Sequence, residues 1–298
     1  MVVRAFGQVA PSDLLALTKP RITLLAVLTV AAGFVLAAPA SLDAWTFATW
    51  RALIHALIGG TLVAGGTNAL NQVLERDVDA LMRRTARRPL PAGRLDPRAA
   101  TTFAVAAGTV GVAYLAMLVN LTTALIAAAT LLSYVLVYTP LKRRTTLATL
   151  VGAVPGALPI VGGWTAAGGT LSERPGVLFA ILFFWQLPHF LALSWIYRDD
   201  YARAGLRMLS VDDTDGTSTF RQAVLTAVAL VPISLVPTLL GMSGVIYFAG
   251  ALGLSGWLVV RAVLAARSRT PHHVRRLFLF TLAYLPAILT FMIADRVA

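Results

Sequence analysis

Nine long apolar runs recur along this chain of 298 residues, and they limit the folds that it can adopt. Each run has about 20 mostly apolar residues, the length that an α-helix needs to cross the hydrocarbon core of a bilayer. Because backbone groups inside a bilayer must hydrogen-bond within the protein, such runs predict an all-α bundle. We expect the helices at residues 21–39, 52–75, 99–118, 121–138, 146–166, 176–197, 222–240, 243–265 and 273–293.

The composition supports a membrane protein and excludes several other classes. Hydrophobic residues make up 58% of the chain and charged residues 13%, which is about half the charged share of soluble domains. The chain has no cysteine, so disulfides and thiolate metal sites are excluded. Its net charge of +12 could indicate a nucleic-acid-binding protein. However, the basic residues cluster between apolar runs, as membrane topology requires, so we expect no nucleic-acid partner.

The basic clusters also predict an orientation. If the N-terminus faces the cytoplasm, every lysine and arginine lies on the inside except Arg51, Arg174 and Arg296. This bias predicts a cytoplasmic N-terminus and an outside C-terminus, in what we interpret as a bacterial cytoplasmic membrane. Two long inside loops, 76–98 and 198–221, hold most of the acidic residues. We expect them to cap the active site of a single domain, 1–298, on its cytoplasmic side.

At the inner end of the second run, three polar residues recur every four positions: Asn71, Glu75 and Asp79. Residues four apart on a helix lie about 40° from each other, so these three form one stripe and Asp77 points elsewhere. Mg²⁺ prefers oxygen ligands and commonly bridges protein carboxylates to substrate phosphates, so the stripe predicts a magnesium site. The alternative is a solvated helix end whose carboxylates pair with neighbouring arginines: Arg76, Arg83 or Arg84.

A basic segment follows the stripe. It includes Arg83, Arg87 and Arg88, and Lys142 and Arg143 follow the fourth apolar run. Cationic side chains beside anionic metal ligands are typical of a site for a Mg²⁺-bound diphosphate. Anchoring at the membrane face is the simpler explanation for the remaining arginines of this segment: Arg84, Arg94 and Arg98.

The sixth run carries a third polar group, formed by Trp185, Gln186 and His189, and it is followed by Asp199 and Asp200. His189 lies ten residues before Asp199, or about 15 Å along a regular helix, which places it inside the bundle. The two aspartates are candidates for a second carboxylate centre that faces the first. An intramembrane histidine can also be a hydrogen-bonded packing residue, and the spacing leaves both interpretations open.

Together these residues resemble the motifs of the UbiA superfamily of intramembrane prenyltransferases. The first motif of that superfamily has the form Asn-x3-Asp-x3-Asp, which Asn71, Glu75 and Asp79 match with glutamate in the middle position. Within the superfamily, the details are similar to the branch that farnesylates haem B. The similarity extends through nearly the whole chain, in segments 17–22, 75–85, 88–93, 138–143, 152–159, 185–190 and 200–201.

One departure concerns the second motif of the superfamily, Asp-x3-Asp. In this chain Tyr197 and Tyr201 stand in the register of those aspartates. The resemblance therefore implies that Asp199 or Asp200 completes a second metal site, without deciding between them.

The resemblance implies nine helices around a central cavity that opens to the cytoplasm and to lipid, with farnesyl diphosphate and haem B as substrates. Mg²⁺ would bind with the diphosphate at Asn71, Glu75, Asp79, Asp199 and Asp200. The diphosphate would contact Arg21, Arg83, Arg87, Arg88, Lys142 and Arg143. Haem would contact Trp185, Gln186 and His189, and further catalytic roles fall to Lys142, Asp200 and Tyr201. The product, haem O, would pass to haem A synthase or a terminal oxidase pathway.

Two other functions compete with this one. A prenyltransferase with a different aromatic acceptor, such as a quinone precursor or a chlorophyll-like ring, would share the metal stripe and differ around Trp185, Gln186 and His189. An ion-coupled transporter would place its charged residues near the midplane of the membrane. The carboxylates of this chain instead gather at one face.

Overall fold

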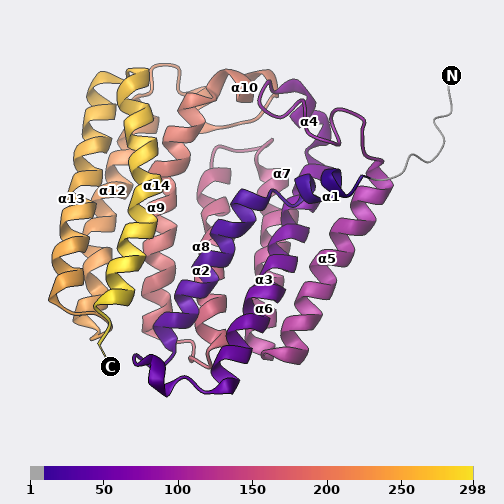
Figure 1. Cartoon of the computed structure of the whole chain (residues 1–298). Coiled ribbons are helices and arrows are strands. Elements are labelled where there is room, and N and C mark those ends of the chain that lie inside the picture. The colour runs from indigo at the N-terminus through magenta and orange to yellow at the C-terminus, as the bar shows by residue number, and fades with distance from the viewer. Residues whose placement is uncertain (1–9, 298) are drawn as a thin grey trace.

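The structure is a computed structural model that describes residues 10–297 (Figure 1), and these residues are almost entirely helical. In chain order the elements are α1 (Pro11–Leu17), α2 (Pro20–Ala37), η1 (Leu42–Ala44), α3 (Phe47–Leu74), α4 (Arg76–Leu81), α5 (Pro97–Leu118), α6 (Leu121–Leu132), η2 (Ser133–Tyr138), α7 (Thr139–Leu141), α8 (Ala148–Ala166), α9 (Glu173–Ile196), α10 (Arg198–Arg203), α11 (Leu209–Asp212), α12 (Thr217–Leu239), α13 (Val245–Ser268) and α14 (Pro271–Ala294).

Within the described residues, nine helical segments are long and apolar enough to cross a membrane, which confirms the predicted number. They are α2, α3, α5, the continuous α6–η2–α7, α8, α9, α12, α13 and α14. Each overlaps its predicted range, and the largest differences are the starts of α3 and α12, at residues 47 and 217. Helix caps explain the early start of α3, because Thr46 Oγ1 accepts a hydrogen bond from Thr49 N (3.3 Å).

The very short turn between α5 and α6 depends on Asn120. Its Oδ1 accepts a hydrogen bond from Thr123 N (2.8 Å) and so caps α6. Its Nδ2 donates to Thr165 O (2.8 Å) and ties the same turn to α8. A single side chain therefore starts one helix and positions it against another.

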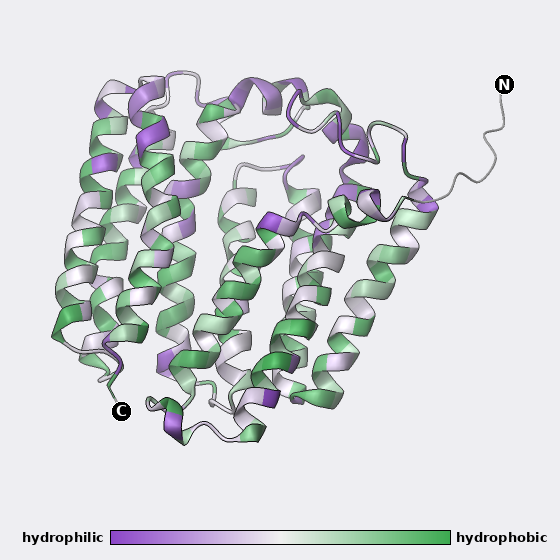
Figure 2. Cartoon of the chain, in the orientation of Figure 1, coloured by the Kyte–Doolittle hydropathy of each residue, from purple (hydrophilic) through white to green (hydrophobic). Residues whose placement is uncertain are grey.

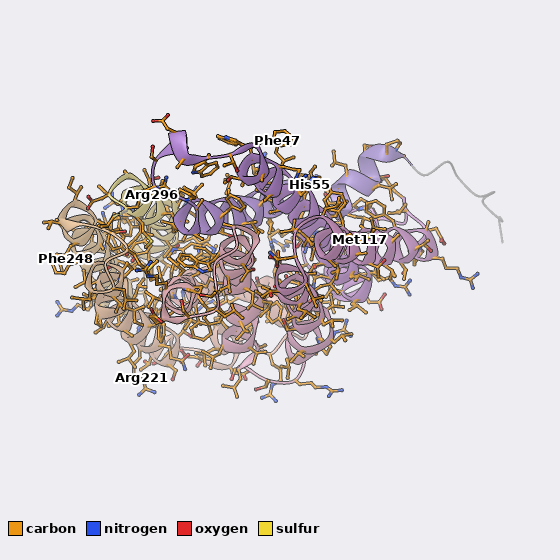
Figure 3. The ribbon with its side chains drawn as sticks, turned by 90° about the horizontal axis from the view of Figure 1, so that it is seen from below. Phe47, His55, Met117, Arg221, Phe248 and Arg296 are labelled. Atoms are coloured by element: carbon orange, nitrogen blue, oxygen red, sulfur yellow. The ribbon has the colours of Figure 1, made fainter. Side chains whose placement is uncertain are left out.

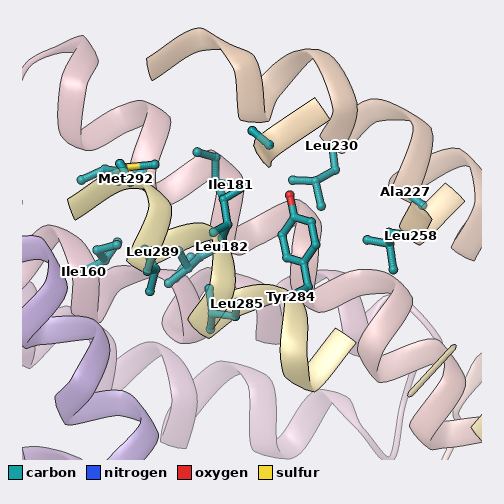
Figure 4. Packing of buried hydrophobic residues seen from close by; sticks show 14 of the residues in the cluster. Ile160, Ile181, Leu182, Ala227, Leu230, Leu258, Tyr284, Leu285, Leu289 and Met292 are labelled. Atoms are coloured by element: carbon teal, nitrogen blue, oxygen red, sulfur yellow. The ribbon is translucent and has the colours of Figure 1, made fainter. Parts of the chain in front are cut away.

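The helices form two halves of different character. In one half, α9, α12, α13 and α14 pack closely around the largest apolar cluster, which includes Ile181, Leu230, Leu258 and Ile288 (Figure 4). In the other half, α3 packs on α5 and α2 packs on α8, with α6 alongside.

A chain of buried hydroxyls crosses the closely packed half, and we name it the hydroxyl network. Ser234 Oγ, Ser255 Oγ and the Tyr284 hydroxyl are linked by contacts of 2.8 and 2.9 Å, and the Tyr247 hydroxyl donates to Ser234 O (2.7 Å). All four residues are fully buried. They connect α12, α13 and α14 without any charged group.

The two ends of the bundle differ as well. One end, which we name the polar end, carries α1, α4, α10 and α11 and most of the hydrophilic segments (Figure 2). The opposite far end carries η1 and the C-terminus (Figure 1). The ribbons of α2 and α14 approach each other at the far end and diverge toward the polar end (Figure 1). The orientation of the chain in a membrane stays a prediction.

Candidate active site

The predicted polar stripe lies where α3 passes into α4. Glu75 N donates to Asn71 O (3.0 Å) and Asp79 N donates to Glu75 O (2.7 Å), so helical hydrogen bonding continues through the junction. The three side chains therefore keep one face, and the residues are only 1%, 7% and 1% exposed for Asn71, Glu75 and Asp79. Asp77 points away, as predicted, with 78% of its side chain exposed.

Each oxygen-bearing side chain of the stripe is paired with a cation from another segment. The bonds are Lys19 Nζ to Asn71 Oδ1 (2.7 Å), Lys142 Nζ to Glu75 Oε1 (2.8 Å) and Arg88 Nη1 to Asp79 Oδ2 (2.6 Å). We name these six residues the charged layer. The solvated helix end considered as an alternative is wrong, because both carboxylates are buried and their partners are Lys142 and Arg88.

Lys19 reaches the layer from the junction of α1 and α2. Its backbone is left-handed, with φ 48° and ψ 67°, a conformation that costs a residue with a β-carbon about 1–2 kcal/mol. Pro20 disfavours the right-handed helical region for the residue before it, so the helix breaks at Lys19. Gln72 holds the end of α1 through a hydrogen bond from its Nε2 to Leu17 O (2.7 Å). Strained backbone of this kind is concentrated at functional sites.

Lys142 is positioned by the irregular end of the fourth span. Here the α-helix gives way to the π-helical segment η2, an irregularity that often marks functional sites. Lys142 Nζ lies 4.4 Å from the centre of the Tyr138 ring, a favourable cation–π contact. Arg207 N donates to Lys142 O (2.8 Å), so the segment after α10 also holds this lysine in place.

The pKa shifts in the charged layer reflect burial and the charges of its cations. Burial, together with the positive charges of Arg88 and Lys142, lowers the pKa of Lys19 to about 7. Burial alone would raise the pKa of Glu75, but the charge of Lys142 and its hydrogen bond outweigh that effect and lower it. A further anion between these cations would relieve their mutual repulsion.

The oxygens of the layer suit a hard cation. One amide and two carboxylates are the ligand types that Mg²⁺ prefers, and Mg²⁺ completes its shell with water and substrate phosphates. Within the described residues, no group of three His, Cys, Asp or Glu side chains is arranged to hold a metal alone. The residues therefore fit a metal ion that arrives together with phosphate oxygens, rather than a permanently bound ion.

Of the two aspartates after the sixth run, Asp200 is buried and the side chain of Asp199 is 93% exposed. The carboxylate of Asp200 accepts hydrogen bonds from Arg83 N and Arg84 N (3.4 Å each) and pairs with Arg203. These partners outweigh the opposing effect of burial and lower the pKa of Asp200. Asp200 therefore ties the segment after α9 to the loop after α4, and a metal role for either aspartate stays a prediction.

Tyr201 packs in a small apolar cluster between the same two segments, beside Val78, Met82, Leu206 and Met208. The loops predicted to cap the site thus contact each other at the polar end.

Among the predicted diphosphate ligands, Arg88 and Lys142 belong to the charged layer. The others are exposed, and no salt bridge joins them to it within the described residues: Arg21, Arg83, Arg87 and Arg143. Their role stays a prediction.

An apolar cavity of about 370 Å³ lies beside the charged layer, between α2, α3, α6, α8, α9 and α14. Asn68, one helical turn from Asn71, and Tyr138, which lies against Lys142, both line it. On one side its lining residues are themselves exposed: Ile22 (56%) and Leu25 (50%) of α2, and Leu282 (41%) of α14. The cavity therefore opens laterally between α2 and α14, on the apolar surface of the bundle.

Trp185 and Gln186 line this cavity, whereas His189 is not among its lining residues. The Gln186 amide donates to Ala153 O (3.1 Å), and a β-carbon at Gly156 would lie 1.9 Å from Gln186 Oε1, so only glycine leaves room for that side chain. The Trp185 indole donates to Thr281 O (2.7 Å), which ties α9 to α14.

His189 lies against α14. Its ring stacks on Trp185 and Phe278, and its Nδ1 lies 2.8 Å from Thr281 Oγ1. The Thr281 hydroxyl donates its only hydrogen to Phe278 O (2.6 Å), so its oxygen accepts the contact from His189 as Nδ1–H. In the neutral form of the ring, the lone pair of the imidazole is then on Nε2. That tautomer is the one that histidine uses when Nε2 binds a metal and Nδ1–H is held by an oxygen.

Two residues of the site, Lys19 and Thr139, were not predicted as site residues from the sequence. Lys19 was noted only as part of a similar segment, and Arg21 was preferred, but the structure directs Lys19 into the layer and leaves Arg21 exposed. Thr139 accepts a hydrogen bond from Asn71 Nδ2 (3.2 Å) and so orients the amide oxygen toward Lys19. The sequence does carry a signal for Lys19, because a proline at the start of a helix disfavours the helical conformation for the residue before it.

Comparison with known proteins supports this description. Three relatives, each named protoheme IX farnesyltransferase, are similar over most of their length. The protein from Solibacter usitatus (strain Ellin6076) is 48% identical, covering 95% of this chain and 98% of its own. The one from Koribacter versatilis (strain Ellin345) is 44% identical, covering 94% and 92%. The one from Salinibacter ruber (strain DSM 13855 / M31) is 43% identical, covering 95% and 98%.

Solved structures share the fold at low sequence identity. A structure described as digeranylgeranylglyceryl phosphate synthase has a TM-score of 0.78 at 15% identity and covers 95% of this chain and 97% of its own. A UbiA homologue from Archaeoglobus fulgidus bound to GPP and Mg²⁺ has a TM-score of 0.65 at 15% identity, covering 94% and 99%. The family model of the UbiA prenyltransferases matches residues 26–285. The chain therefore belongs to the UbiA prenyltransferase family.

Proposed function

We propose that the chain transfers the farnesyl group of farnesyl diphosphate to a vinyl group of haem B and that water adds to the product, giving haem O and diphosphate. The observation that carries this proposal is the charged layer, in which three buried oxygen-bearing side chains pair with three partly buried cations beside an apolar cavity. The names of the relatives, which are 38–48% identical, support the farnesyl donor and the haem acceptor.

The charged layer would bind the diphosphate end of the donor. Lys19, Lys142 and Arg88 each have an oxygen partner within 2.8 Å, and phosphate oxygens would replace these partners. Asn71, Glu75 and Asp79 would then be free to hold Mg²⁺, as the structures of related folds with GPP or DMAPP and Mg²⁺ suggest. When bound, Mg²⁺ supplies a Lewis acid and a template for the leaving diphosphate.

The cavity would hold the farnesyl chain. Its size falls in the range of small-molecule sites, which runs from about 300 to 1,000 Å³, and its walls are almost entirely apolar. The bond between the farnesyl carbon and diphosphate breaks, and its electron pair leaves with the diphosphate. The vinyl carbon of haem attacks the resulting allylic cation, and water then adds to the new cationic centre and loses a proton. Apolar walls delay the competing capture of the first cation by water.

The haem acceptor would lie along α9 and α14. Trp185 offers an aromatic surface at the cavity wall, and Gln186 offers an amide held by Ala153 O. In its neutral form His189 would present an Nε2 lone pair, because Thr281 Oγ1 accepts from Nδ1–H. We assign His189 to contact with the iron or with the reacting vinyl group, with Thr281 as its positioning residue.

The direct test is to incubate purified protein with farnesyl diphosphate, haem B and Mg²⁺ and to analyse the haem by mass spectrometry. We expect haem to gain one farnesyl group and one hydroxyl group, and we expect chelation of Mg²⁺ to stop the reaction. Haem that stays unmodified, while a quinone precursor or a chlorophyll-like ring is prenylated, would show that the acceptor is wrong but the family chemistry is right.

Two wider points belong to the same proposal. We place the polar end in the cytoplasm of a bacterium, because most of the described lysines and arginines lie there. We also place the enzyme before haem A synthase or a terminal oxidase pathway, because its product is a haem with a lipophilic tail.

A further inference from the structure

The far end of the bundle is poor in positive charge, which makes its few arginines informative. Among the described residues, only Arg51, Arg174 and Arg296 lie there, and the other lysines and arginines lie at or toward the polar end. Two of these three exceptions, Arg174 and Arg296, line the same pocket of about 320 Å³. The positive-inside bias explains why arginines are few at this end, but it does not explain why two of them line the same pocket.

The pocket lies where four segments meet. The end of α2, the start of α9, the turn between α12 and α13 and the residues after α14 all contribute to it. Figure 3 views this end of the molecule, with Arg296 beside the end of α2. Apart from the two arginines, all of its lining residues are apolar or glycine, so the pocket contains no carboxylate.

Arg296 is held in the pocket by neutral partners. Its guanidinium donates to Pro39 O (2.9 Å) and also to the carbonyls of Val35 and Ala40. Carbonyl oxygens fix its position but carry no net charge, so its positive charge stays uncompensated. The nearby carboxylate of Asp295 accepts from Tyr247 N (2.7 Å) and does not pair with it.

Arg174 completes the arrangement from the first turn of α9. It is exposed, and no salt bridge within the described residues involves it or Arg296. Two guanidiniums without an anionic partner therefore share one concave site. Arginine is the side chain best suited to bind phosphate oxygens, through charge-assisted and often paired hydrogen bonds.

We propose that this pocket is a binding site for a phosphate monoester or diester, and that its usual occupant is the headgroup of an anionic phospholipid. The pocket lies at the end of the membrane-spanning helices, at the level of lipid headgroups, and its apolar residues include Leu36, Met242 and Val297. Basic pockets between spanning helices at the cytoplasmic side recognise such headgroups, and two guanidiniums at the far end offer a phosphate the same charge-assisted hydrogen bonds. This site is independent of the function proposed above.

A phosphate in this pocket would have a structural effect. It would join Arg174 of α9 to Arg296, which already holds the carbonyls at the end of α2. The far end of α2 would then be fixed to the closely packed half, and the lateral mouth would lie at the other end of the same helix. Lipid composition would thereby set how firmly α2 is anchored.

The chain offers a matched test. Arg174→Ala removes one guanidinium of the pocket, and Arg51→Ala removes the third arginine of the far end, which does not line the pocket. Each purified full-length protein is placed in bilayers of phosphatidylcholine with or without phosphatidylglycerol. Thermal unfolding and the lipid retained in native mass spectrometry are then measured, with inorganic phosphate in detergent as a separate arm.

We expect phosphatidylglycerol to stabilise the wild type and the Arg51→Ala variant, and to be retained about tenfold less by Arg174→Ala, the loss typical of one charge-assisted hydrogen bond. If inorganic phosphate stabilises equally and with the same dependence on Arg174, the site stands but its occupant is a soluble phosphate. Equal retention by Arg174→Ala and wild type, or equal loss by Arg51→Ala, would overturn the proposal.

Discussion

Two polar clusters are buried in this bundle, and they are built in opposite ways. The hydroxyl network links α12, α13 and α14 through Ser234, Ser255, Tyr247 and Tyr284, with every partner neutral. The charged layer gathers three cations, two carboxylates and an amide from segments far apart in the chain. The hydroxyl network is fully buried, whereas the charged layer has buried oxygens and partly buried cations. One consists of hydroxyls that satisfy each other and the other consists of ions.

The difference is the reason why we propose a structural role for the hydroxyl network and a ligand-binding role for the charged layer. Interhelical hydrogen bonds of hydroxyls in membranes contribute about 0.6 kcal/mol each, and the network needs nothing further. A buried ion pair loses its hydration and is often no more stabilising than apolar residues of the same volume. The charged layer therefore makes physical sense as a site that exchanges its internal partners for a metal ion and phosphate.

The largest effect should come from Asp79. We expect Asp79→Asn to lower farnesyl transfer by more than about 100-fold, because a lost metal ligand should cost more than the loss of a neighbouring partner. Asp77→Asn, two residues away and exposed, is the matched control and should be close to wild type. Turnover by mass spectrometry over a range of Mg²⁺ concentrations measures both. An Asp79→Asn enzyme with normal Mg²⁺ dependence would remove the metal assignment.

Removing the partner of Glu75 by a substitution at Lys142 should lower both the stability of the protein and its turnover. Lys142→Met leaves the carboxylate of Glu75 buried without its partner, which should cost about 3–5 kcal/mol of stability and lower turnover about 10–100-fold. The control is Arg143→Met, because Arg143 is exposed. Unfolding in detergent and steady-state kinetics are measured on the same samples. A stable and active Lys142→Met protein would contradict the pairing of these two residues.

A substitution of Asp200 tests whether the charged layer extends into the loop 198–221. Asp200→Ala removes the acceptor of Arg83 N and Arg84 N, and we expect the KM for farnesyl diphosphate to rise about tenfold while kcat changes less. Asp199→Ala should leave both parameters unchanged, since its side chain is exposed. If Asp200→Ala instead lowers kcat and alters the Mg²⁺ requirement, Asp200 is a metal ligand rather than a link between loops.

Thr281 tests a hydroxyl that belongs to neither cluster. Thr281→Val keeps the shape of the side chain but removes the acceptor that fixes the His189 tautomer. We expect haem affinity to fall about fivefold, the equivalent of one neutral hydrogen bond, with a shift in the haem absorption spectrum. Thr281→Ser should restore both. Spectra that are the same for wild type, Thr281→Val and His189→Ala would return His189 to a packing role.

The smallest effect should come from the hydroxyl network. Tyr284→Phe removes the contact with Ser255 Oγ and should cost about 0.6–1 kcal/mol of stability. Farnesyl transfer and haem binding should not change, because none of the four residues of this network lines the apolar cavity. Thermal unfolding measures the first effect and kinetics the second. Loss of activity without loss of stability would mean that the network is coupled to the site.

The fold followed closely from the sequence, because hydropathy and charge vary along the chain on the scale of whole helices. All nine spans were expected near their observed positions. The starts of α3 and α12 differed by five residues, since polar side chains cap both helices beyond their apolar parts: Thr46 Oγ1 accepts from Thr49 N, and Asp213 Oδ2 accepts from Thr219 N. Helical spacing also predicted the stripe of Asn71, Glu75 and Asp79, because hydrogen bonding continues from α3 into α4.

The partners of the stripe could not be predicted in the same way. Lys19, Lys142 and Arg88 reach it from a left-handed residue, a π-helical segment and an irregular loop, where no periodicity gives the direction of a side chain. The direction of His189 toward α14 depends on the rotation of α9 about its axis, which packing against neighbouring helices decides. Sequence spacing therefore locates residues along an element, and tertiary contacts decide what they face.

Because the apolar cavity opens laterally between α2 and α14, the relevant substrate concentration for this enzyme is the one in the bilayer. A donor with an isoprenoid tail and a product that has gained one both prefer acyl chains to water, so we expect them to exchange with the bilayer where the cavity opens, at Ile22, Leu25 and Leu282. Affinity is then a partition between the cavity and a two-dimensional solvent, measured per lipid rather than per litre. Diluting the protein into more lipid or detergent would lower its apparent affinity without altering a single residue.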